Sequence, residues 1–201
     1  MIKYFRFTFV ISSLFLLFMI SSCGKQEKKS TLSRNQLDSI AFSLKEIEYS
    51  LDTIWENMIE DDNQKIADAK RLLEEITYTN VYNQEQYDSL MQKLVKLQNM
   101  RYDEISMENS SLIDDYDSAS NKVMNDIISL AASHPDFERY PLMKVLIKDI
   151  QEANGRVLKH RINYDFAAKT YNQFIEENKE QLEEGDSTKQ LNKKPLFELA
   201  S

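Results

Sequence analysis

The scarcity of glycine and proline is the feature that most limits what this chain can fold into. Glycine occurs only at positions 24, 155 and 185 and proline only at positions 135, 141 and 195, so neither occurs between Lys25 and His134. A β-sheet protein of this length needs many tight turns, and such turns are normally rich in glycine, proline and asparagine. The sequence therefore predicts an all-α fold in which long helices have few connections.

Apolar periodicity predicts a first helix from about Arg34 to Tyr78. Apolar residues recur at spacings of three and four along residues 37–58, the pattern of a helix that packs almost parallel to a neighbour. After Glu60-Asp61-Asp62 the pattern resumes one residue out of phase, over residues 66–76. A phase shift in a long helix exposes such acidic residues, so we interpret them as solvated. Binding of a cation or of a basic partner is the alternative.

A second apolar pattern extends from Asn83 to Ser133. Asn83 can cap a helix by accepting a backbone N–H, and Gln86 is placed to return the bond. Residues 106–111 are poor helix formers, so the pattern fits one long helix or two shorter ones. One heptad phase in this segment contains Met91, Val95, Tyr102, Ile105, Leu112, Tyr116, Ala119 and Val123.

Two prolines separate this segment from the last predicted helix. Pro141 suits a first helical turn, and the apolar pattern then continues without a slip from Leu146 to Phe174, with Gly185 as the C-terminal stop. Gly155, inside this helix, costs up to about 1 kcal/mol in helix propensity, and we interpret it as permitting a close helix contact. Together these segments predict an elongated antiparallel bundle of three to four long helices.

The N-terminal residues have the features of an export signal. Lys3 and Arg6 precede an uncharged and largely apolar run, and Ile20-Ser21-Ser22-Cys23 resembles the lipobox of bacterial lipoproteins. The run falls short of the roughly 20 apolar residues that span a membrane. We therefore predict that the signal peptide is cleaved and that Cys23 is lipidated. An uncleaved signal anchor is the alternative.

Four segments follow from this interpretation of the N-terminus. They are a signal peptide at 1–22, a lipidated Cys23 with a flexible tether at 23–33, a helical bundle at 34–184 and a C-terminal tail at 185–201. Lipid on Cys23, the only cysteine, would hold the protein at the cell membrane or the outer membrane on the exported side. Cleavage would lower the net charge from −8 to −10, and such acidity argues against nucleic acid as a partner.

No set of residues forms a recognisable catalytic, cofactor or metal site. The only histidines, His134 and His160, lack the spacing of a metal motif, and no serine sits in a glycine elbow. We interpret His134 as a cap at a helix end. His160 lies on the apolar face of the last helix, and we interpret it as a hydrogen-bonded core or edge residue rather than a ligand. The prediction is a protein with no enzymatic activity, cofactor or metal. A cleft with a buried carboxylate of shifted pKa near His160 would instead indicate an enzyme.

The C-terminal third, from Ala132 onward, contains a series of short motifs in a fixed order and spacing. They are His134-Pro135-Asp136-Phe137, Tyr140-Pro141, Asn154-Gly155-Arg156-Val157, Arg161, Tyr164-Asp165, Tyr171-Asn172 and Lys194-Pro195-Leu196-Phe197-Glu198. With Trp55 as an isolated match earlier in the chain, this series resembles the LemA family of membrane-attached bacterial proteins. The resemblance implies a long antiparallel helical domain and attachment to a membrane in a divergent relative. It implies no agreed enzymatic chemistry.

Five residues within this resemblance form the candidate interaction site. Arg156, Arg161, Tyr164, Tyr171 and Asn172 recur on or beside one face of the last helix. We interpret this face as a packing surface that orders the bundle, with the binding of a partner as the alternative. The apolar stretch at residues 195–199 is expected to fold back on the end of the bundle.

Two hypotheses about function follow. The first is a non-enzymatic, membrane-tethered protein that acts through protein contacts in the cell envelope, self-association being one such contact. The second is a binding module that takes a small ligand or a peptide in a groove between helices.

Overall fold

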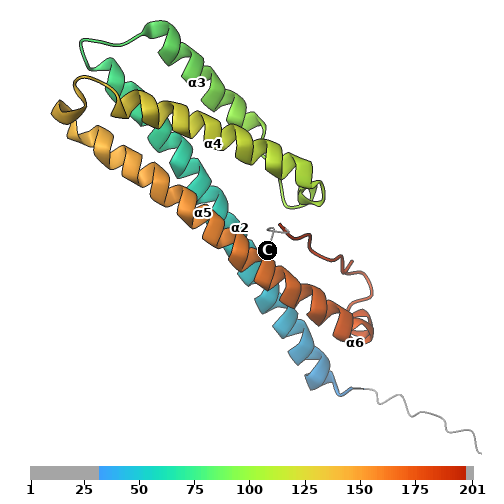
Figure 1. The fold of residues 1–201 in the computed structure, drawn as a ribbon. Helices are drawn as coiled ribbons and strands as arrows, with labels where there is room; N and C mark the ends of the chain where they lie inside the picture. Colours follow the sequence, from blue (N-terminus) through green and yellow to red (C-terminus); the bar gives the residue numbers. More distant parts are fainter. Residues whose placement is uncertain (1–31, 198–201) are drawn as a thin grey trace, which may run out of the picture. The chain divides into compact units, whose positions relative to one another are not determined.

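Two long helices, α2 (Arg34–Thr77) and α5 (Pro141–Glu177), organise the part of the chain that the computed structural model describes, residues 32–197. They run antiparallel and contact each other extensively (Figure 1). At about 1.5 Å per residue, the 44 residues of α2 extend over roughly 66 Å. The predicted first helix is confirmed to within one residue at its C-terminal end.

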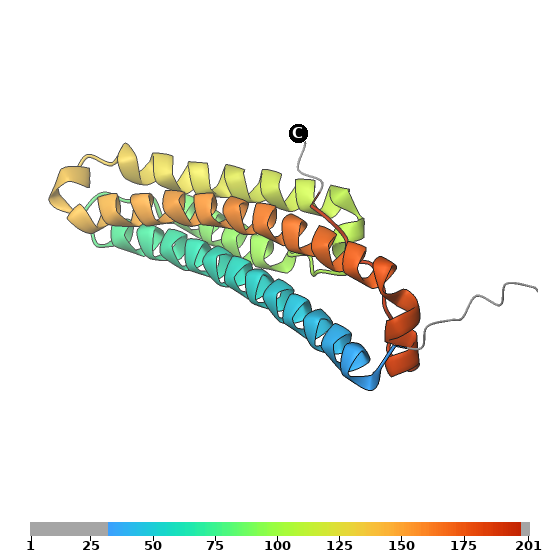
Figure 2. The ribbon, with the colours of Figure 1, turned by 90° about the horizontal axis from the view of Figure 1, so that it is seen from below.

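Two shorter helices, α3 (Gln84–Asn99) and α4 (Ser110–Ala132), pack on the half of the α2–α5 pair that contains the C-terminal end of α2 (Figures 1 and 2). Successive helices reverse direction, so this half is an up-down-up-down bundle of four helices. Its apolar core combines residues 66–76, 90–97, 116–131 and 143–150. No β-strand occurs within residues 32–197, and the predicted all-α bundle is confirmed.

The other half of the α2–α5 pair is covered by different parts of the chain. The short helix α6 (Lys179–Gly185) follows α5, and the tail then returns toward the middle of the bundle (Figure 1). A second apolar cluster forms here from Leu44, Leu51, Met58, Met107, Ile113, Val157, Tyr164, Ala168, Tyr171, Ile175, Leu182 and Phe197. The bundle therefore has two apolar cores, one between four helices and one beneath a loop and the tail.

The segment between Asn83 and Ser133 forms two helices rather than one. Asn83 caps α3 as predicted, because its side chain accepts the N–H of Gln86 at 3.0 Å. The helix ends at Asn99, where Asp103 and Ser106 exchange side-chain and backbone hydrogen bonds that compete with helix. Residues 106–108 form a single 3₁₀ turn before α4 begins.

The single heptad phase predicted across this segment is wrong, because the break resets the helical register. Val95 is 58 % exposed and Ile105 is 82 % exposed, although both belong to that phase. The buried residues of α3 are instead Leu90, Leu94 and Leu97.

The last predicted helix is also broken. Helix α5 is capped by Asn178, whose side-chain amide donates to the carbonyl of Phe174 at 2.9 Å. Helix α6 starts at the next residue. Gly185 ends α6 rather than α5. Asparagine binds nearby carbonyls in this way at helix ends, and this local competition is what interrupts the helix.

Gly155 permits no close helix contact, so that interpretation is wrong. It is exposed in the middle of α5, and a Cβ atom added there would meet nothing within 4 Å. We predict that Gly155→Ala raises the free energy of unfolding by about 0.5–1 kcal/mol, because alanine loses less backbone entropy in a helix. Urea unfolding followed by circular dichroism measures this change, and a destabilised variant would contradict it.

His134 joins two loops at the four-helix end of the bundle. Its Nδ1 accepts the N–H of Asp136 at 3.1 Å, so its Nε2 carries the proton and donates to the carbonyl of Val81 at 2.6 Å. The hydroxyl of Thr79 lies 3.1 Å from the same nitrogen. The imidazole thus joins the α2–α3 connection to the α4–α5 connection and does not bond the last carbonyls of α4, so the predicted cap is wrong.

The predictions for the N-terminus lie outside the described residues. The signal peptide at 1–22 and Cys23 are both in this category, as is most of the tether. Among the helices of residues 32–197, none combines the length and apolar character required to cross a membrane.

Candidate functional site

The five residues of the candidate interaction site serve two different contacts. Arg161, Tyr164, Tyr171 and Asn172 lie on the part of α5 that faces the tail and the loop at 100–109, and all but Asn172 are buried. Arg156 is exposed and binds α2 instead. The packing interpretation therefore accounts for four of the five residues.

Arg161 forms the most extensive polar contact of this group. Its guanidinium donates two hydrogen bonds to the carboxylate of Asp117 on α4, at 2.6 and 2.7 Å, and a third to the hydroxyl of Tyr102 at 2.8 Å. Burial lowers the pKa of Arg161, but the hydrogen bonds and charge interactions with Asp117 and Tyr102 together raise it by more, so the group stays charged. Its side chain joins α5, α4 and the loop.

Tyr164 of α5 binds the same loop through Glu104. Its side chain is fully buried, and its hydroxyl donates to Glu104 at 2.6 Å. Glu104 also pairs with the ammonium of Lys194 in the tail at 2.8 Å. Burial, and then the bond to Glu104, raise the pKa of Tyr164 above its ordinary value. The phenol thus stays neutral and donates a hydrogen bond to the carboxylate of Glu104.

Phe197, the last residue of the tail that the structure describes, lies in an aromatic cluster at the middle of α2. The ring of Phe197 stacks on Trp55 with centroids 6.3 Å apart, and meets Tyr164 and Tyr102 edge-on at 5.5 and 6.1 Å. The guanidinium carbon of Arg161 lies 5.1 Å from the centroid of Phe197. The tail therefore folds back as predicted, but it docks at mid-bundle, because the aromatic cluster and its cation lie there rather than at the end.

The backbone of the tail is bound by two side chains of α5. The amide of Asn172 donates to the carbonyl of Lys194 at 2.9 Å, and its oxygen accepts the N–H of Lys194 at 2.7 Å. The carboxylate of Asp165 accepts the N–H of Phe197 at 2.7 Å. Asn172 is thus a residue that positions the tail, whatever side chains the tail carries.

Arg156 and His160 meet one carboxylate on α2. Arg156 donates to Asp61 at 2.7 Å, and Nε2 of His160 lies 3.1 Å from the other oxygen of Asp61. His160 is thus a hydrogen-bonded residue at the edge of the helix pair, as predicted. Arg156 is about half exposed, so this pair resembles a surface contact of small energy.

The interpretation of Asp62 as a solvated residue is wrong. Asp62 is buried at 6 % exposure and faces Lys65, whose ammonium lies 2.8 Å away and is itself almost fully buried. Arg101 lies 3.1 Å from its second oxygen, and the hydroxyl of Tyr116 donates to the same atom. The basic partners of this acidic segment therefore come from within the chain. They form a polar layer where the apolar phase of α2 shifts.

Burial raises the pKa values of the tyrosines of this region. Burial raises the pKa of Tyr102 to about 12 from its ordinary value of 10.0, although Arg161 opposes the shift. A raised folded-state pKa stabilises the fold fully below pH 10, and this contribution is lost as the pH rises toward 12. We predict that unfolding by urea becomes easier across this window.

A matched variant separates Tyr102 from the other tyrosines. Tyr102→Phe should lose less stability than the parent across the same pH window, because it has no phenol to ionise there. Unfolding midpoints in urea at several pH values provide the measurement. Parallel decreases in the parent and the variant would contradict the assignment.

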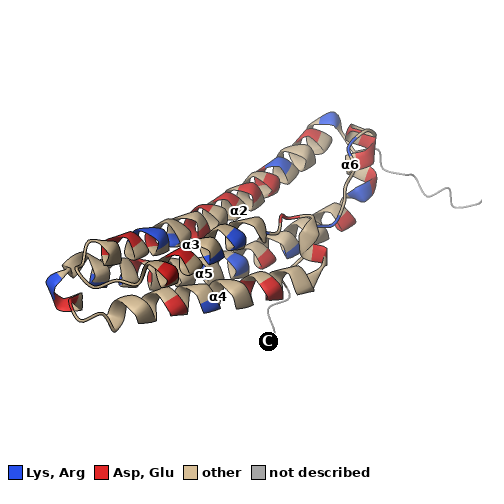
Figure 3. Ribbon diagram, turned by 90° about the horizontal axis from the view of Figure 1, so that it is seen from above, with Lys and Arg blue, Asp and Glu red and all other residues tan. Residues whose placement is uncertain are grey.

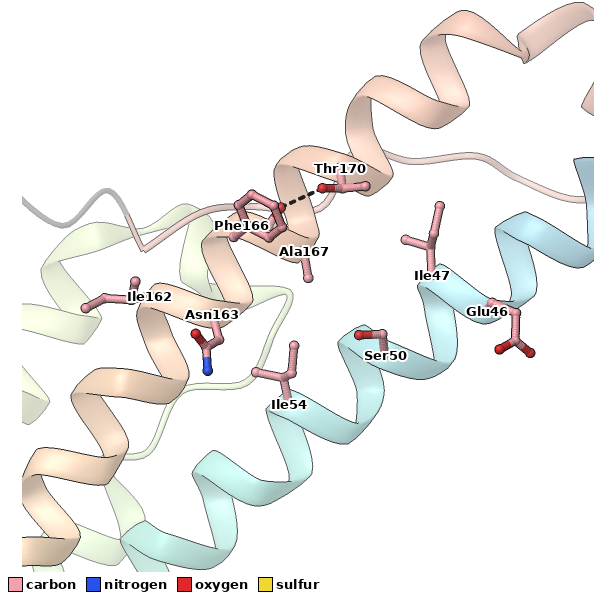
Figure 4. Close-up of a pocket in the computed structure, with 9 residues that line it drawn as sticks. All are labelled: Glu46, Ile47, Ser50, Ile54, Ile162, Asn163, Phe166, Ala167 and Thr170. Atoms are coloured by element: carbon pink, nitrogen blue, oxygen red, sulfur yellow. Dashed lines mark hydrogen bonds between the residues drawn. The ribbon is translucent and has the colours of Figure 1, made fainter.

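A groove of about 660 Å³ lies between α2 and α5 (Figure 4). Its lining consists of Glu46, Ile47, Ser50 and Ile54 from α2 and Ile162, Asn163, Phe166, Ala167 and Thr170 from α5. At about 3.6 residues per turn, Asn163 and Ala167 lie on the side of α5 opposite to Asp165 and Asn172. The groove therefore lies on the flank of the helix pair away from the tail.

The groove was missed by the sequence analysis, although a signal for it exists. Leu158, Ile162 and Phe166 follow one another at spacings of four, one turn apart, and are 51 %, 54 % and 75 % exposed. Single exposed apolar residues are ordinary, but a continuous row on one helix marks a surface for contacts. This row stands outside the buried pattern that identified α5, and could have been recognised by its spacing alone.

The described side chains present no assembled metal site. Within residues 32–197, no group of three or more histidine, cysteine, aspartate or glutamate residues is placed to hold a metal ion. Comparison with known proteins adds no assignment, since no protein-family model matches the chain and no curated protein or solved structure is similar enough to match it.

Proposed function

We propose that this chain is a lipid-anchored, non-enzymatic protein of LemA-like type, held at a membrane through Cys23, that binds a helix of another envelope protein. The observation that carries the binding part is the groove between α2 and α5, whose lining includes the exposed apolar residues Ile162 and Phe166. Cys23 and the residues that resemble the LemA family support the membrane part.

The dimensions of the groove favour a helix as its occupant. The lining runs from Glu46 to Ile54 on one helix and from Ile162 to Thr170 on the other, about two helical turns on each side. An amphipathic helix anchors in such a groove through apolar residues one and two turns apart. Further along the bundle, α4 packs against both long helices and α3 packs against α2, so this pair already accepts helices as neighbours.

The charge of the protein favours a protein partner over nucleic acid. The chain has 33 acidic and 25 basic residues, and Figure 3 shows the two kinds interspersed along the helices. Nucleic-acid binding needs a concentration of basic residues on one surface.

A second candidate is a binding module for a small ligand in the same groove. A volume of about 660 Å³ lies within the usual range of roughly 300–1,000 Å³ for small-molecule sites. Apolar side chains with a few polar groups, here Ser50, Asn163 and Thr170, are also typical of such sites. Two results would favour this candidate. Apolar small molecules would bind saturably both to the unaltered chain and to Ile162→Ala, and the same molecules would displace a bound partner helix.

Site-specific photocrosslinking in cells tests the helix-binding proposal. A photoreactive residue at Asn163, which is exposed in the groove, should form a discrete adduct. Ile162→Glu should abolish that adduct, because it places a charge in an apolar contact. Val145→Glu is the matched control, since Val145 is 50 % exposed on the same helix and does not line the groove. An adduct that persists in Ile162→Glu would refute the proposal.

Replacement of Cys23 tests the membrane anchor separately. Cys23→Ala should abolish labelling by a fatty-acid analogue and release the protein from the membrane fraction. Retention of the variant in that fraction would indicate an uncleaved anchor instead.

A further inference from the structure

The contacts of the tail have the form of a peptide-binding site that the chain fills with its own segment. Asn172 and Asp165 bind only backbone groups of the tail, at Lys194 and Phe197. Proteins that bind extended peptides commonly use main-chain hydrogen bonds for affinity and side-chain pockets for selectivity. Backbone binding of this kind does not depend on which chain supplies the segment.

The spacing of the two backbone contacts matches an extended segment. Asp165 and Asn172 are seven residues apart on α5, which is about 10.5 Å along a helix at 1.5 Å per residue. Lys194 and Phe197 are three residues apart, which is about 10 Å in an extended chain at 3.3 Å per residue. A rigid helix therefore presents two anchors at the separation that an extended peptide requires.

The side-chain contacts select a basic residue followed by an aromatic one. Trp55, Tyr102 and Tyr164 surround the ring of Phe197, and Arg161 lies against it. A cavity of about 820 Å³ adjoins the position of the basic residue, and its acidic lining residues are Glu48, Asp52, Glu104 and Glu108. An acidic rim beside an aromatic pocket complements a segment in which lysine or arginine precedes phenylalanine.

The residues that connect the tail to α6 are weakly held. Residues 186–193 are exposed apart from the half-buried Leu191. Lys189 pairs with Glu48 at 2.8 Å and Lys193 with Glu176 at 3.0 Å, and in both pairs the lysine is well exposed. Exposed ion pairs contribute little to stability. The connection can therefore move while the bundle beneath it stays folded.

We propose that this groove binds an extended segment of a partner protein in which a basic residue precedes an aliphatic and an aromatic residue, as in Lys194-Pro195-Leu196-Phe197. The chain's own tail is the resident occupant and competes with the partner. A tethered segment has an effective concentration in the millimolar range, so only a segment that binds better or is locally concentrated displaces it. This site lies on the flank of the helix pair opposite to the groove of the proposed function.

Fluorescence of Trp55, the only tryptophan, provides the test. In the full chain carrying Phe197→Ala, loss of the stacked ring should shift Trp55 emission to the red. A synthetic peptide with the sequence of residues 193–199 should reverse the shift and saturate. The same peptide should bind the unaltered chain at least roughly tenfold more weakly, because the intact tail occupies the groove.

Controls make each outcome decisive. A peptide with alanine in place of its phenylalanine should not reverse the shift, and Asn172→Ala added to Phe197→Ala should weaken binding of the intact peptide by roughly tenfold, the effect of losing paired backbone bonds. Circular dichroism shows whether Phe197→Ala keeps its helix content. If it does not, Leu196→Ala provides the weakened tail, because Leu196 is only half-buried.

Three results would overturn the proposal. They are no saturable response to the peptide in a folded variant, an equal response to the alanine peptide, and equal affinity for the unaltered chain. Exchange of tails between two copies, seen as a dimer of the unaltered chain in sedimentation, would assign the site to a second copy and also refute a partner segment. Ile162→Glu should leave peptide binding unchanged, so failure here is distinguishable from failure of the proposed function.

Discussion

Asp62→Ala is expected to lower the free energy of unfolding by about 3–5 kcal/mol, the usual cost of removing one member of a buried ion pair. The ammonium of Lys65 would be left buried at 3 % exposure without the carboxylate that lies 2.8 Å from it. Arg101 and the hydroxyl of Tyr116 would lose the same acceptor. Urea unfolding followed by circular dichroism measures the loss.

Two further variants identify its cause. Asp38→Ala is the matched control, because Asp38 is exposed on the same helix and should change stability by no more than about 0.5 kcal/mol. Replacing Asp62 by leucine together with Lys65 by methionine should recover most of the loss, since apolar residues of similar volume often replace a buried pair without cost. An equal loss in the double variant would show that shape, rather than the unpaired charge, determines the effect.

Tyr164→Ala is expected to cost about 3–5 kcal/mol, as is typical when a large aromatic side chain is removed from a core. Tyr164 is fully buried, and its ring contacts both Trp55 and Phe197. The variant would therefore leave a cavity at the point where the tail meets α2 and α5. Differential scanning calorimetry or urea unfolding measures the loss.

The same helix offers a control for this variant. Phe166→Ala, two residues further along α5, should change stability by no more than about 0.5 kcal/mol, because Phe166 is 75 % exposed. Tyr164→Phe should cost about 1 kcal/mol, the typical value of a hydrogen bond such as that to Glu104. Similar losses for Tyr164→Ala and Phe166→Ala would contradict the burial pattern described above.

The polar layer and the tail together explain how one pair of long helices is covered along its length. The helices α3 and α4 cover one half, and the loop at 100–109 with the tail covers the other. Arg161 joins these parts, since it binds Asp117 on α4, Tyr102 in the loop and the ring of Phe197. The second core thus depends largely on a loop and a tail that lie outside the long helices. The flank that carries Ile162 and Phe166 stays open.

Part of the candidate site was recognised in the sequence, and part was not. Spacing on one helix predicted a shared face for four residues, Arg161, Tyr164, Tyr171 and Asn172. All four contact or pack near the tail or the loop. The role of Asp165 was not predicted, because an acidic residue beside a tyrosine on a helix usually faces solvent. Its partner is the backbone of Phe197, 32 residues away.

The sequence by itself determined the all-α class, the position of α2 and the cap at Asn83. These features depend on residues a few positions apart, such as the bond from Gln86 to Asn83 and the recurrence of apolar residues every three or four positions along one helix face. Scarce glycine and proline act in the same local way. Such information is present in any short window of the chain.

Only the tertiary structure decided that Asp62 is buried and that the tail docks beside Trp55. Each of these depends on partners far apart in sequence, such as Tyr116 for Asp62 and Asn172 for Lys194. A charged residue has the same local pattern whether it meets water or an opposite charge. Its burial is settled by the free energy of a contact that forms only when the helices assemble.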